Sequence, residues 1–301
     1  MTIVLLFVKN IFSMDIKEAI EIIQRIDPKL MLKIQKKAFN KWDGLLNQKE
    51  LYYYTSTNTL INGIITEKPE IGKEICIWAT RWSHLNDSTE NRIGLDLMLE
   101  MGTPKEIVDQ IRANINKNHS ISLTTQFDYL PMWKMYGDNG NGAMLVFDCE
   151  KLIDKYEGRI QYCIYENDDY DEHFIRTMSN LDFGLDFKDI HQIAKEYIIA
   201  VIFQLYCSII KSQHFSYEKE VRIVGCGNPY FQNPESTVFY RYSNGKVIPY
   251  VKEFLPKNAL KKVYLGPLAN IELSKDTLKE YLISKNMGHV DVCTSTIPYR
   301  G

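Results

Sequence analysis

The sequence lacks the marks of several common protein classes. Its six cysteines include no C-x-x-C pair and have no regular spacing, which argues against a structural zinc site or a disulfide framework. Charge of one sign is not in excess either, because 36 Lys and Arg balance 38 Asp and Glu to a formal net charge of −2. We therefore expect reduced thiols in a cytoplasmic protein that binds no metal. The net charge does not favour binding to nucleic acid, although the sequence does not exclude a local basic patch.

Long apolar runs are also scarce. The run 197–210 is interrupted by Gln204 and is shorter than the roughly 20 residues of a membrane span, so we expect a buried helix and no membrane partner. A signal peptide has a basic residue before its apolar run and a small-residue cleavage site after it, and the run 3–8 has neither. Asp15 and Glu18, in capping-box spacing, begin a better helix signal, so we expect residues 1–13 to be an upstream-start extension.

Repeats, low-complexity tracts and linkers are absent from the sequence, and short strand-like runs alternate with helical ones. We therefore predict an N-terminal extension and helical appendage at 1–49, followed by one α+β domain at 50–301. The predicted fold has split, mostly antiparallel β-sheets flanked by helices. Strands are predicted at 51–55, 75–80, 120–125, 143–148, 159–165, 219–224, 237–242, 246–251, 262–265 and 290–295. Helices are predicted at 16–40, 87–101, 103–117, 149–156, 187–211 and 272–285, with a loop around Pro131 and residues 137–142.

The stretch 218–224 is the most informative part of the chain. As a strand, it places Glu218, Glu220 and Arg222 on one face, while Val221 and Ile223 face a core. Two carboxylates a few ångströms apart can stabilise a sugar oxocarbenium ion and accept a proton, as in glycosidic-bond chemistry. The alternative is a solvated face with ordinary ion pairs, which composition alone favours.

Three further segments carry polar or aromatic side chains that could form a site, although each also has a structural explanation. Tyrosines on a half-buried strand are normal, and Asp87 with Glu90 fits a helix capping box. Motifs such as G-x-G-x-x-G, the P-loop, G-x-S-x-G and H-E-x-x-H do not occur. The candidates in these segments are Tyr52, Tyr53, Thr55, Ser122, Thr124, Trp133, Tyr136, His84, Asn86, Asp87 and Glu90.

The order of these segments resembles bacterial domain-of-unknown-function family 2971 (DUF2971). The resemblance covers about residues 50–300 and implies no established activity, but members of the family look like accessory genes of mobile and phage-defence regions. The segments that carry it are Tyr54-Thr55-Ser56, Leu85-Asn86-Asp87-Ser88-Thr89-Glu90, Ser122-Leu123-Thr124, Met132-Trp133-Lys134-Met135-Tyr136-Gly137, 142–148, Tyr217-Glu218-Lys219-Glu220-Val221-Arg222 and Leu265-Gly266-Pro267.

More remotely, the chain resembles the ADP-ribosyltransferase fold, which binds NAD between two small sheets. The family's first mark, an aromatic and basic strand, falls on Tyr52-Tyr53, with Tyr53 where an arginine or histidine is usual. Its Ser-Thr-Ser strand falls on 122–124, where Leu123 departs from the pattern, and its Glu-x-Glu strand falls on 215–221.

This resemblance implies roles for the candidates. Glu220 would stabilise the oxocarbenium ion as nicotinamide leaves, and Glu218 would activate the acceptor or a water. Phe215 and Tyr217 would face the acceptor. NAD would be the substrate, held by Tyr52, Tyr53, Thr55, Ser122, Thr124, Trp133 and Tyr136.

Three hypotheses about function follow from the sequence. The first is an NAD-dependent ADP-ribosyltransferase or NAD glycohydrolase, acting on a macromolecular acceptor or water as an anti-phage defence effector. The second is a non-catalytic sensor of a nucleotide ligand or a phage protein. The third is a nucleotide-directed hydrolase that uses His84 with Asp87 or Glu90.

Overall fold

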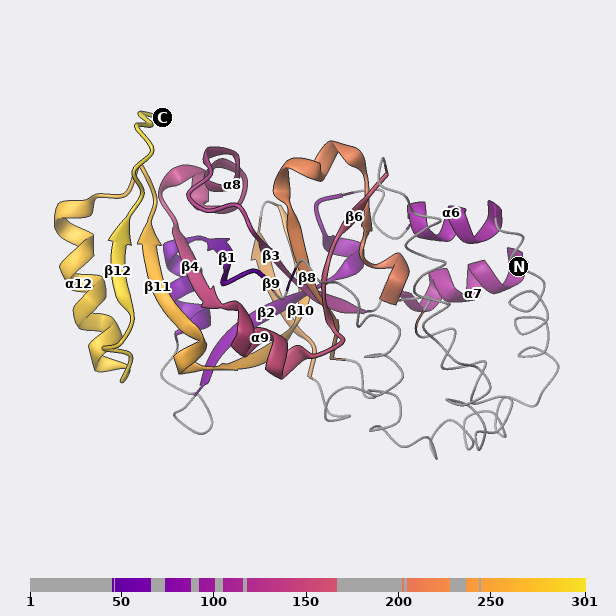
Figure 1. Cartoon of the computed structure of the whole chain (residues 1–301), viewed down its shortest axis with the longest axis horizontal. Coiled ribbons are helices and arrows are strands. Elements are labelled where there is room, and N and C mark those ends of the chain that lie inside the picture. The colour runs from indigo at the N-terminus through magenta and orange to yellow at the C-terminus, as the bar shows by residue number, and fades with distance from the viewer. Residues whose placement is uncertain are drawn as a thin grey trace.

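The computed structural model describes residues 45, 47–65, 74–87, 92–100, 105–115, 118–166, 202, 205–227, 237–243 and 245–301. In this part of the chain a large sheet occupies the middle of the molecule (Figure 1). Helix α12 (Ile271–Ser284) lies at one end of the long axis, while α6 (Arg92–Glu100) and α7 (Lys105–Ile115) lie at the other. The predicted helix 16–40, and the expectation for residues 1–13, lie outside the described residues.

The central sheet has ten strands and, apart from one parallel pair, is antiparallel. Its main path runs β12-β11-β4-β1-β3-β2-β10-β9, and β8 and β5 continue from the other edge of β3. In chain order the strands are β1 (Glu50–Thr55), β2 (Glu74–Arg81), β3 (His119–Thr124), β4 (Ala143–Asp148), β5 (Ile160–Tyr162), β8 (Glu220–Cys226), β9 (Phe239–Ser243), β10 (Lys246–Pro256), β11 (Leu260–Leu265) and β12 (Asp291–Thr294). A separate parallel pair joins β6 (Ile164–Tyr165) to β7 (Ile210–Lys211).

The sheet is split at β3. Strand β1 pairs with β3 only where Tyr52 lies opposite Thr124. Strand β2 reaches β3 only at its other end, where Thr80 and Arg81 lie opposite Ser120 and His119. Strand β8 pairs along the other edge of β3. Strands β1 and β2 therefore share one edge of β3, at opposite ends, and each continues into a separate wing of the sheet. The predicted mostly antiparallel α+β fold is confirmed, although ten of its strands form one large sheet and not separate sheets.

Both faces of the β1–β4 wing are buried. Alternating residues of β4 divide between two cores, since Leu145 and Phe147 belong to the main core and Met144 and Val146 to a smaller one that also contains Trp133. This explains why β4 reads as a continuous apolar run, and alternation along β1 likewise turns Tyr52 and Tyr54 toward the smaller core.

Short helices connect the strands and close the ends of the sheet. The helix α9 begins as predicted, because the Asp148 side chain accepts a hydrogen bond from the backbone N–H of Lys151. The connecting elements are α5 (Thr57–Thr59), η1 (Leu60–Ile64), η2 (Trp82–His84), α8 (Leu130–Tyr136), η3 (Asp138–Gly140), α9 (Cys149–Tyr156), η4 (Gln213–Glu218) and η5 (Lys257–Ala259).

Three local predictions were wrong. Residues around Pro131 form the helix α8 instead of a loop, because proline in the first turn needs no N–H and its fixed φ suits a helix. The predicted helix 187–211 does not continue to its end, since 210–211 form β7. The strand predicted from Glu218 begins at Glu220, because Glu218 ends η4 and Lys219 turns the chain in a left-handed conformation with φ of 44°.

Candidate functional site

Three strands bring the three predicted segments into one row. Thr124 of β3 lies opposite Tyr52 of β1 on one side and opposite Glu220 of β8 on the other. Directly opposed residues of antiparallel strands share a face, with Cα atoms about 4.5–5.5 Å apart. The tyrosine-rich strand, the Ser-x-Thr strand and the Glu-x-Glu segment therefore meet where the sheet splits.

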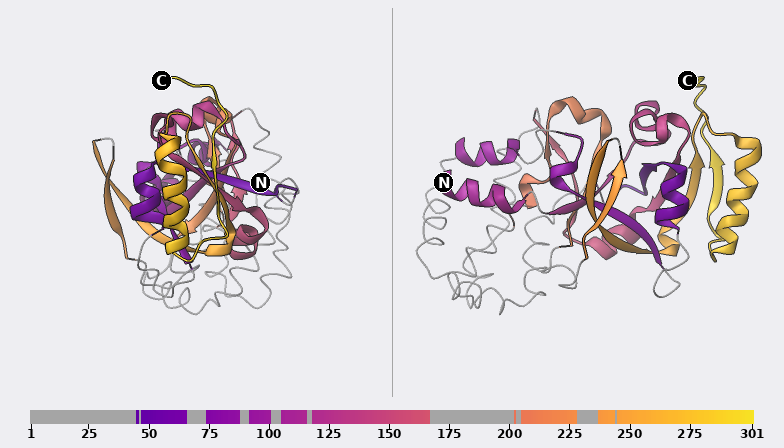
Figure 2. Two further views of the ribbon diagram at one scale, coloured as in Figure 1. Left: turned by 90° about the vertical axis from the view of Figure 1, so that its left-hand side faces the viewer. Right: turned by 180° about the vertical axis from the view of Figure 1, so that it is seen from behind.

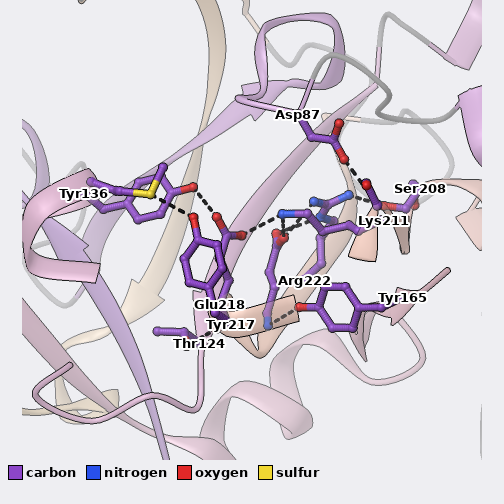
Figure 3. Close-up of polar contacts among 12 residues, drawn as sticks. Asp87, Thr124, Tyr136, Tyr165, Ser208, Lys211, Tyr217, Glu218 and Arg222 are labelled. Atoms are coloured by element: carbon purple, nitrogen blue, oxygen red, sulfur yellow. Dashed lines mark hydrogen bonds and ion pairs between the residues drawn. The ribbon is translucent and has the colours of Figure 1, made fainter. Parts of the chain in front are cut away.

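Lys211 joins the two carboxylates of the Glu-x-Glu segment. Its Nζ lies 2.7 Å from Oε2 of Glu218 and 2.6 Å from Oε2 of Glu220. Figure 3 shows Lys211 and Glu218 pointing toward each other. Glu218 and Glu220 thus converge although they do not belong to one strand, because the left-handed Lys219 between them turns the chain. The two carboxylates share one ammonium group, which holds them side by side.

Arg222 completes a buried cluster of alternating charges. Its Nε and Nη2 each lie 2.9 Å from an oxygen of Glu220, which is the bidentate geometry of a strong guanidinium–carboxylate pair, and its Nη1 donates to the Ser208 carbonyl. The side chains of Lys211, Glu218, Glu220 and Arg222 are only 5%, 5%, 3% and 1% exposed. The alternative of a solvated face is therefore wrong for this cluster, which carries two charges of each sign out of water.

Neighbouring hydroxyl groups hold both glutamates in place. The Tyr136 hydroxyl donates to Oε1 of Glu218 at 2.6 Å, and Oγ1 of Thr124 donates to the Glu218 carbonyl at 2.5 Å. The backbone N–H of Glu220 donates to the Tyr165 hydroxyl at 2.9 Å. Tyr136 lies on helix α8, so the segment around Pro131 that was predicted to be a loop positions the hydroxyl that binds Glu218.

The charges of the cluster decide the ionisation of Glu220. Burial alone would raise the pKa of this carboxyl, but the charges of Arg222 and Lys211 hold its pKa far below the usual range. Burial, and then the negative charge of Glu218, raise the pKa of Tyr136, so this phenol stays protonated and remains a donor. At neutral pH the site thus contains an ionised Glu220 and a neutral Tyr136 that donates to the neighbouring Glu218.

An aromatic group lies beside the cluster and belongs to the smaller core. The Tyr54 and Trp133 rings meet edge to face at 4.9 Å, and the Tyr52 ring lies 5.4 Å from Phe127, which is itself exposed. Burial and then Glu50 raise the pKa of Tyr52 to about 12. Trp133 is fully buried, so the structure places it in the core under α8 and not on a surface.

The segment with Asn86 and Asp87 also reaches the cluster. The buried Asp87 accepts a hydrogen bond at 3.4 Å from the backbone N–H of Ser212, the residue after Lys211. The Asn86 side chain interacts with the Tyr136 hydroxyl. His84 instead pairs with its neighbour, Nδ1 lying 2.9 Å from the Ser83 hydroxyl. Glu90 lies outside the described residues.

The remaining predicted residues lie either beside the charged cluster, or exposed on the sheet, or in the core. The Nζ of Lys211 lies over the Phe215 ring, 4.9 Å from the ring centre. The Tyr217 hydroxyl donates to Sδ of Met135 at 2.8 Å. Ser122 is exposed and lies opposite Arg222 on the neighbouring strand. Tyr53 packs against the main core, and Thr55 is buried opposite Ala143.

The sequence did not indicate Lys211 as a member of the cluster, nor Tyr165 and Ser208 as hydrogen-bond partners of Glu220 and Arg222. Lys211 was placed at the end of a helix, and it reaches the glutamates only because residues 210–211 form a strand. One signal could have pointed to it, since two close carboxylates need more positive charge than Arg222 alone supplies.

Comparison with family models finds a match to part of the chain. Residues 132–223 match the model of the family described as protein of unknown function (DUF2971), which supports the resemblance seen in the sequence for this part of the chain. The matched residues include Tyr136 and all four charged residues of the cluster. No curated protein and no solved structure matches the chain.

Three other features of the described residues bear on the sequence predictions. None of the six cysteines forms a disulfide. No helix in the described ranges is long and apolar enough to cross a membrane. Within the same ranges, no group of three or more His, Cys, Asp and Glu side chains is placed to hold a metal ion.

Proposed function

We propose that the protein consumes NAD, either as an ADP-ribosyltransferase or as an NAD glycohydrolase. The observation that carries the proposal is the row Tyr52–Thr124–Glu220 at the split of the sheet, with Glu218 beside it. An aromatic residue, a hydroxyl and an ionised carboxylate close together are the groups needed to bind a nucleotide and to stabilise a sugar cation. The acceptor would be water or a macromolecule, and a role as a cytoplasmic effector in anti-phage defence is part of the same proposal.

The cluster suggests how the two carboxylates would share the work. Arg222 grips Glu220 through two parallel hydrogen bonds and would hold it in a fixed orientation toward the oxocarbenium ion. Lys211, a flexible point charge, would move from the carboxylates to a phosphate oxygen of the dinucleotide and so leave Glu218 able to accept a proton from the acceptor. Tyr136 would keep Glu218 oriented during that exchange.

One observation favours a second candidate, a non-catalytic sensor of a nucleotide ligand or phage protein. All four carboxylate oxygens of Glu218 and Glu220 already accept hydrogen bonds from Lys211, Arg222 or Tyr136. Carboxylates so fully paired are typical of a structural ion cluster. In that case the cluster would shape a binding surface without performing chemistry.

Release of nicotinamide from NAD by the full chain tests the first proposal against the second. We expect Glu220→Gln to lower the rate of release by at least about 10²-fold, because a charge aimed at the transition state contributes several kcal/mol to the barrier. Glu218→Gln should retain part of the NAD cleavage and lose transfer to the acceptor. Binding of NAD without turnover would support the sensor instead, and neither binding nor turnover would contradict both.

The control has to account for stability, since Glu220 is buried. Glu253→Gln is suitable because Glu253 is equally buried but lies in a separate network, with its carboxylate 3.9 Å from Nη2 of Arg159 and 3.2 Å from the Tyr156 hydroxyl. This variant should lose stability and keep NAD turnover. If turnover in Glu220→Gln, Glu218→Gln and Glu253→Gln falls only in proportion to the fraction of unfolded protein, the catalytic role of Glu220 is refuted.

A further inference from the structure

A second row of opposed residues crosses the sheet at the other end of β3. Ser120 of β3 lies opposite Thr80 of β2, and Thr80 lies opposite Tyr250 of β10. Because side chains alternate along a strand, Ser120 faces the same side of the sheet as Thr124, which lies opposite Glu220. Four residues of β3 separate the two rows, which corresponds to about 14 Å of extended chain.

The middle of β3 is open to solvent between these two rows. Ser122, which shares their face, is the one exposed residue of the strand. Strand β1 pairs with β3 only at Thr124, and β2 pairs only at Ser120 and His119, so neither strand continues beside this residue. An extended ligand bound at Glu220 can therefore run along this face toward the second row.

Arg241 reaches the second row from the hairpin of β9 and β10, which projects from one side of the molecule (Figure 2). Its Nη2 donates to Oγ1 of Thr80 at 2.9 Å, and its guanidinium carbon lies 5.5 Å from the centre of the Trp78 ring. The Trp78 ring packs in turn on Tyr250, with 4.7 Å between ring centres. Burial raises the pKa of Tyr53, and the charge of Arg241 opposes that rise, so the guanidinium also lies close to the tyrosine-rich strand β1. These contacts fix the plane of the guanidinium.

The hydrogen-bonding capacity of this group of side chains is not used up. Within the described residues Arg241 forms no ion pair, and its buried Nε has no hydrogen-bond partner. The hydroxyl of Ser120, a residue that is only 2% exposed, has no partner among those residues either. Oγ1 of Thr80 accepts from Arg241, so its own proton is available to a further acceptor. Because buried donors are nearly always paired in native proteins, these donors indicate an acceptor that comes from outside the chain.

The charge of this region favours an anion as that acceptor. Arg81 follows Thr80 in the sequence and, like Arg241, forms no ion pair in the part of the chain that the structure describes. Two guanidinium charges without carboxylate partners make the local potential positive. A guanidinium whose plane is fixed matches a phosphate group in particular, because it can donate two parallel hydrogen bonds to two phosphate oxygens.

We propose that Arg241, Thr80 and Ser120 bind a phosphate group of a nucleotide. If the nucleotide is NAD, this is the phosphate on the adenosine side, since Lys211 is assigned to the phosphate nearer the glycosidic bond. The dinucleotide then lies along β3, with its glycosidic bond at Glu220 and its far phosphate at the second row. The identity of the ligand rests on the proposed function, whereas the phosphate site rests on the three side chains themselves.

Binding of ADP to the full chain, measured by isothermal titration calorimetry, tests the site apart from NAD chemistry, because ADP has no bond to nicotinamide. We expect Arg241→Gln to weaken ADP binding at least about tenfold, and Arg241→Lys, which keeps the charge, to recover part of that loss. Adenosine, which has no phosphate, should bind wild type and Arg241→Gln alike. An equal loss of affinity for adenosine would overturn the assignment of a phosphate to Arg241.

Lys252→Gln is the matched control. Lys252 belongs to the same hairpin and also lies over a ring, with its Nζ 4.3 Å from the centre of the Phe239 ring. It lies opposite Trp78, beyond the part of β2 that pairs with β3, so this variant should bind ADP like wild type. A loss as large as that of Arg241→Gln would mean that the general charge of the hairpin, and not a phosphate site, attracts ADP.

Nicotinamide release from NAD separates a failure of this inference from a failure of the proposed function. If both hold, Arg241→Gln should raise KM at least about tenfold and leave kcat nearly unchanged, because the phosphate contact is the same before and in the transition state. Wild-type protein that binds ADP through Arg241 but leaves NAD intact would uphold the phosphate site and contradict NAD consumption. Turnover of NAD with KM and ADP affinity unchanged in Arg241→Gln, or wild-type protein that binds no ADP, would overturn the phosphate site.

Discussion

Replacing Lys211 with methionine should destabilise the protein by about 3–5 kcal/mol, because it removes the charge shared by two buried carboxylates. Methionine keeps much of the length and apolar volume of the side chain, so packing changes little. Glu220 keeps Arg222, but Glu218 keeps only the neutral Tyr136 and becomes a buried, uncompensated charge. Urea unfolding of the full chain at pH 7, followed by circular dichroism, measures the loss.

A surface ion pair of the same length provides the control. Lys105 Nζ lies 2.6 Å from Asp109, as close as Lys211 lies to Glu220, but these side chains are 74% and 42% exposed. Lys105→Met should leave the unfolding midpoint unchanged within error, since water already screens the pair. Equal, small effects of the two substitutions would refute the reasoning that burial makes the Lys211 cluster costly to break.

The same cluster predicts a pH dependence of wild-type stability. The folded-state pKa of Glu220 lies below its unfolded value of about 4.3, so its ion pairs contribute stability above that pH and lose it as the pH falls further. The difference in unfolding free energy between wild type and Lys211→Met should therefore narrow in acid. Protonation neutralises Glu218, the buried carboxylate that has lost its ammonium partner in the variant. A gap that stays constant down to pH 3 would contradict this account.

Three further predictions concern other parts of the fold. Burial and then the charge of Arg81 lower the pKa of His119 to about 4, so stability should fall as the pH drops from about 6.5 toward 4, and urea titrations of His119→Gln should show a flatter profile. Asp128 accepts hydrogen bonds from Ser295, Thr296 and Trp133, so Asp128→Asn, which suits its left-handed backbone, should cost about 1–3 kcal/mol and speed proteolysis of the C-terminal segment. Gly142→Ala should lower the Tm strongly because its Cβ would lie 2.2 Å from the Thr55 carbonyl, whereas Gly288→Ala, with 3.6 Å to its nearest neighbour, should change the Tm little.

The sequence allowed the strands to be predicted well because their signals are local. Alternation and apolar runs located β1, β4 and β8 to within two residues, and the capping side chain of Asp148 marked the start of α9. The errors arose where tertiary contacts override local signals. The stretch around Pro131 has one local helix signal, the proline in its first turn, but no side-chain cap, and α8 is stabilised mainly because Met132 and Trp133 pack in the smaller core.

The candidate site could be predicted in part. Thr124, Glu218 and Glu220 were identified from residue type and order, and their meeting with Tyr52 follows from the sheet register, which the sequence order does not reveal. Burial of the Glu218–Glu220 pair could not be read from the sequence, because charged strands are usually solvated. It depends on Lys211, which lies close in sequence but on a short strand whose pairing with β6 is non-local.

The most direct test of the central claim is nicotinamide release from NAD by the wild-type full chain, measured beside Glu220→Gln and the folded control Glu253→Gln. The account predicts turnover by wild type and Glu253→Gln, and a loss of at least about 10²-fold in Glu220→Gln. Wild-type protein that is folded and leaves NAD intact, or a folded Glu220→Gln protein with unchanged turnover, would contradict the claim that the row Tyr52–Thr124–Glu220 is a site of NAD chemistry.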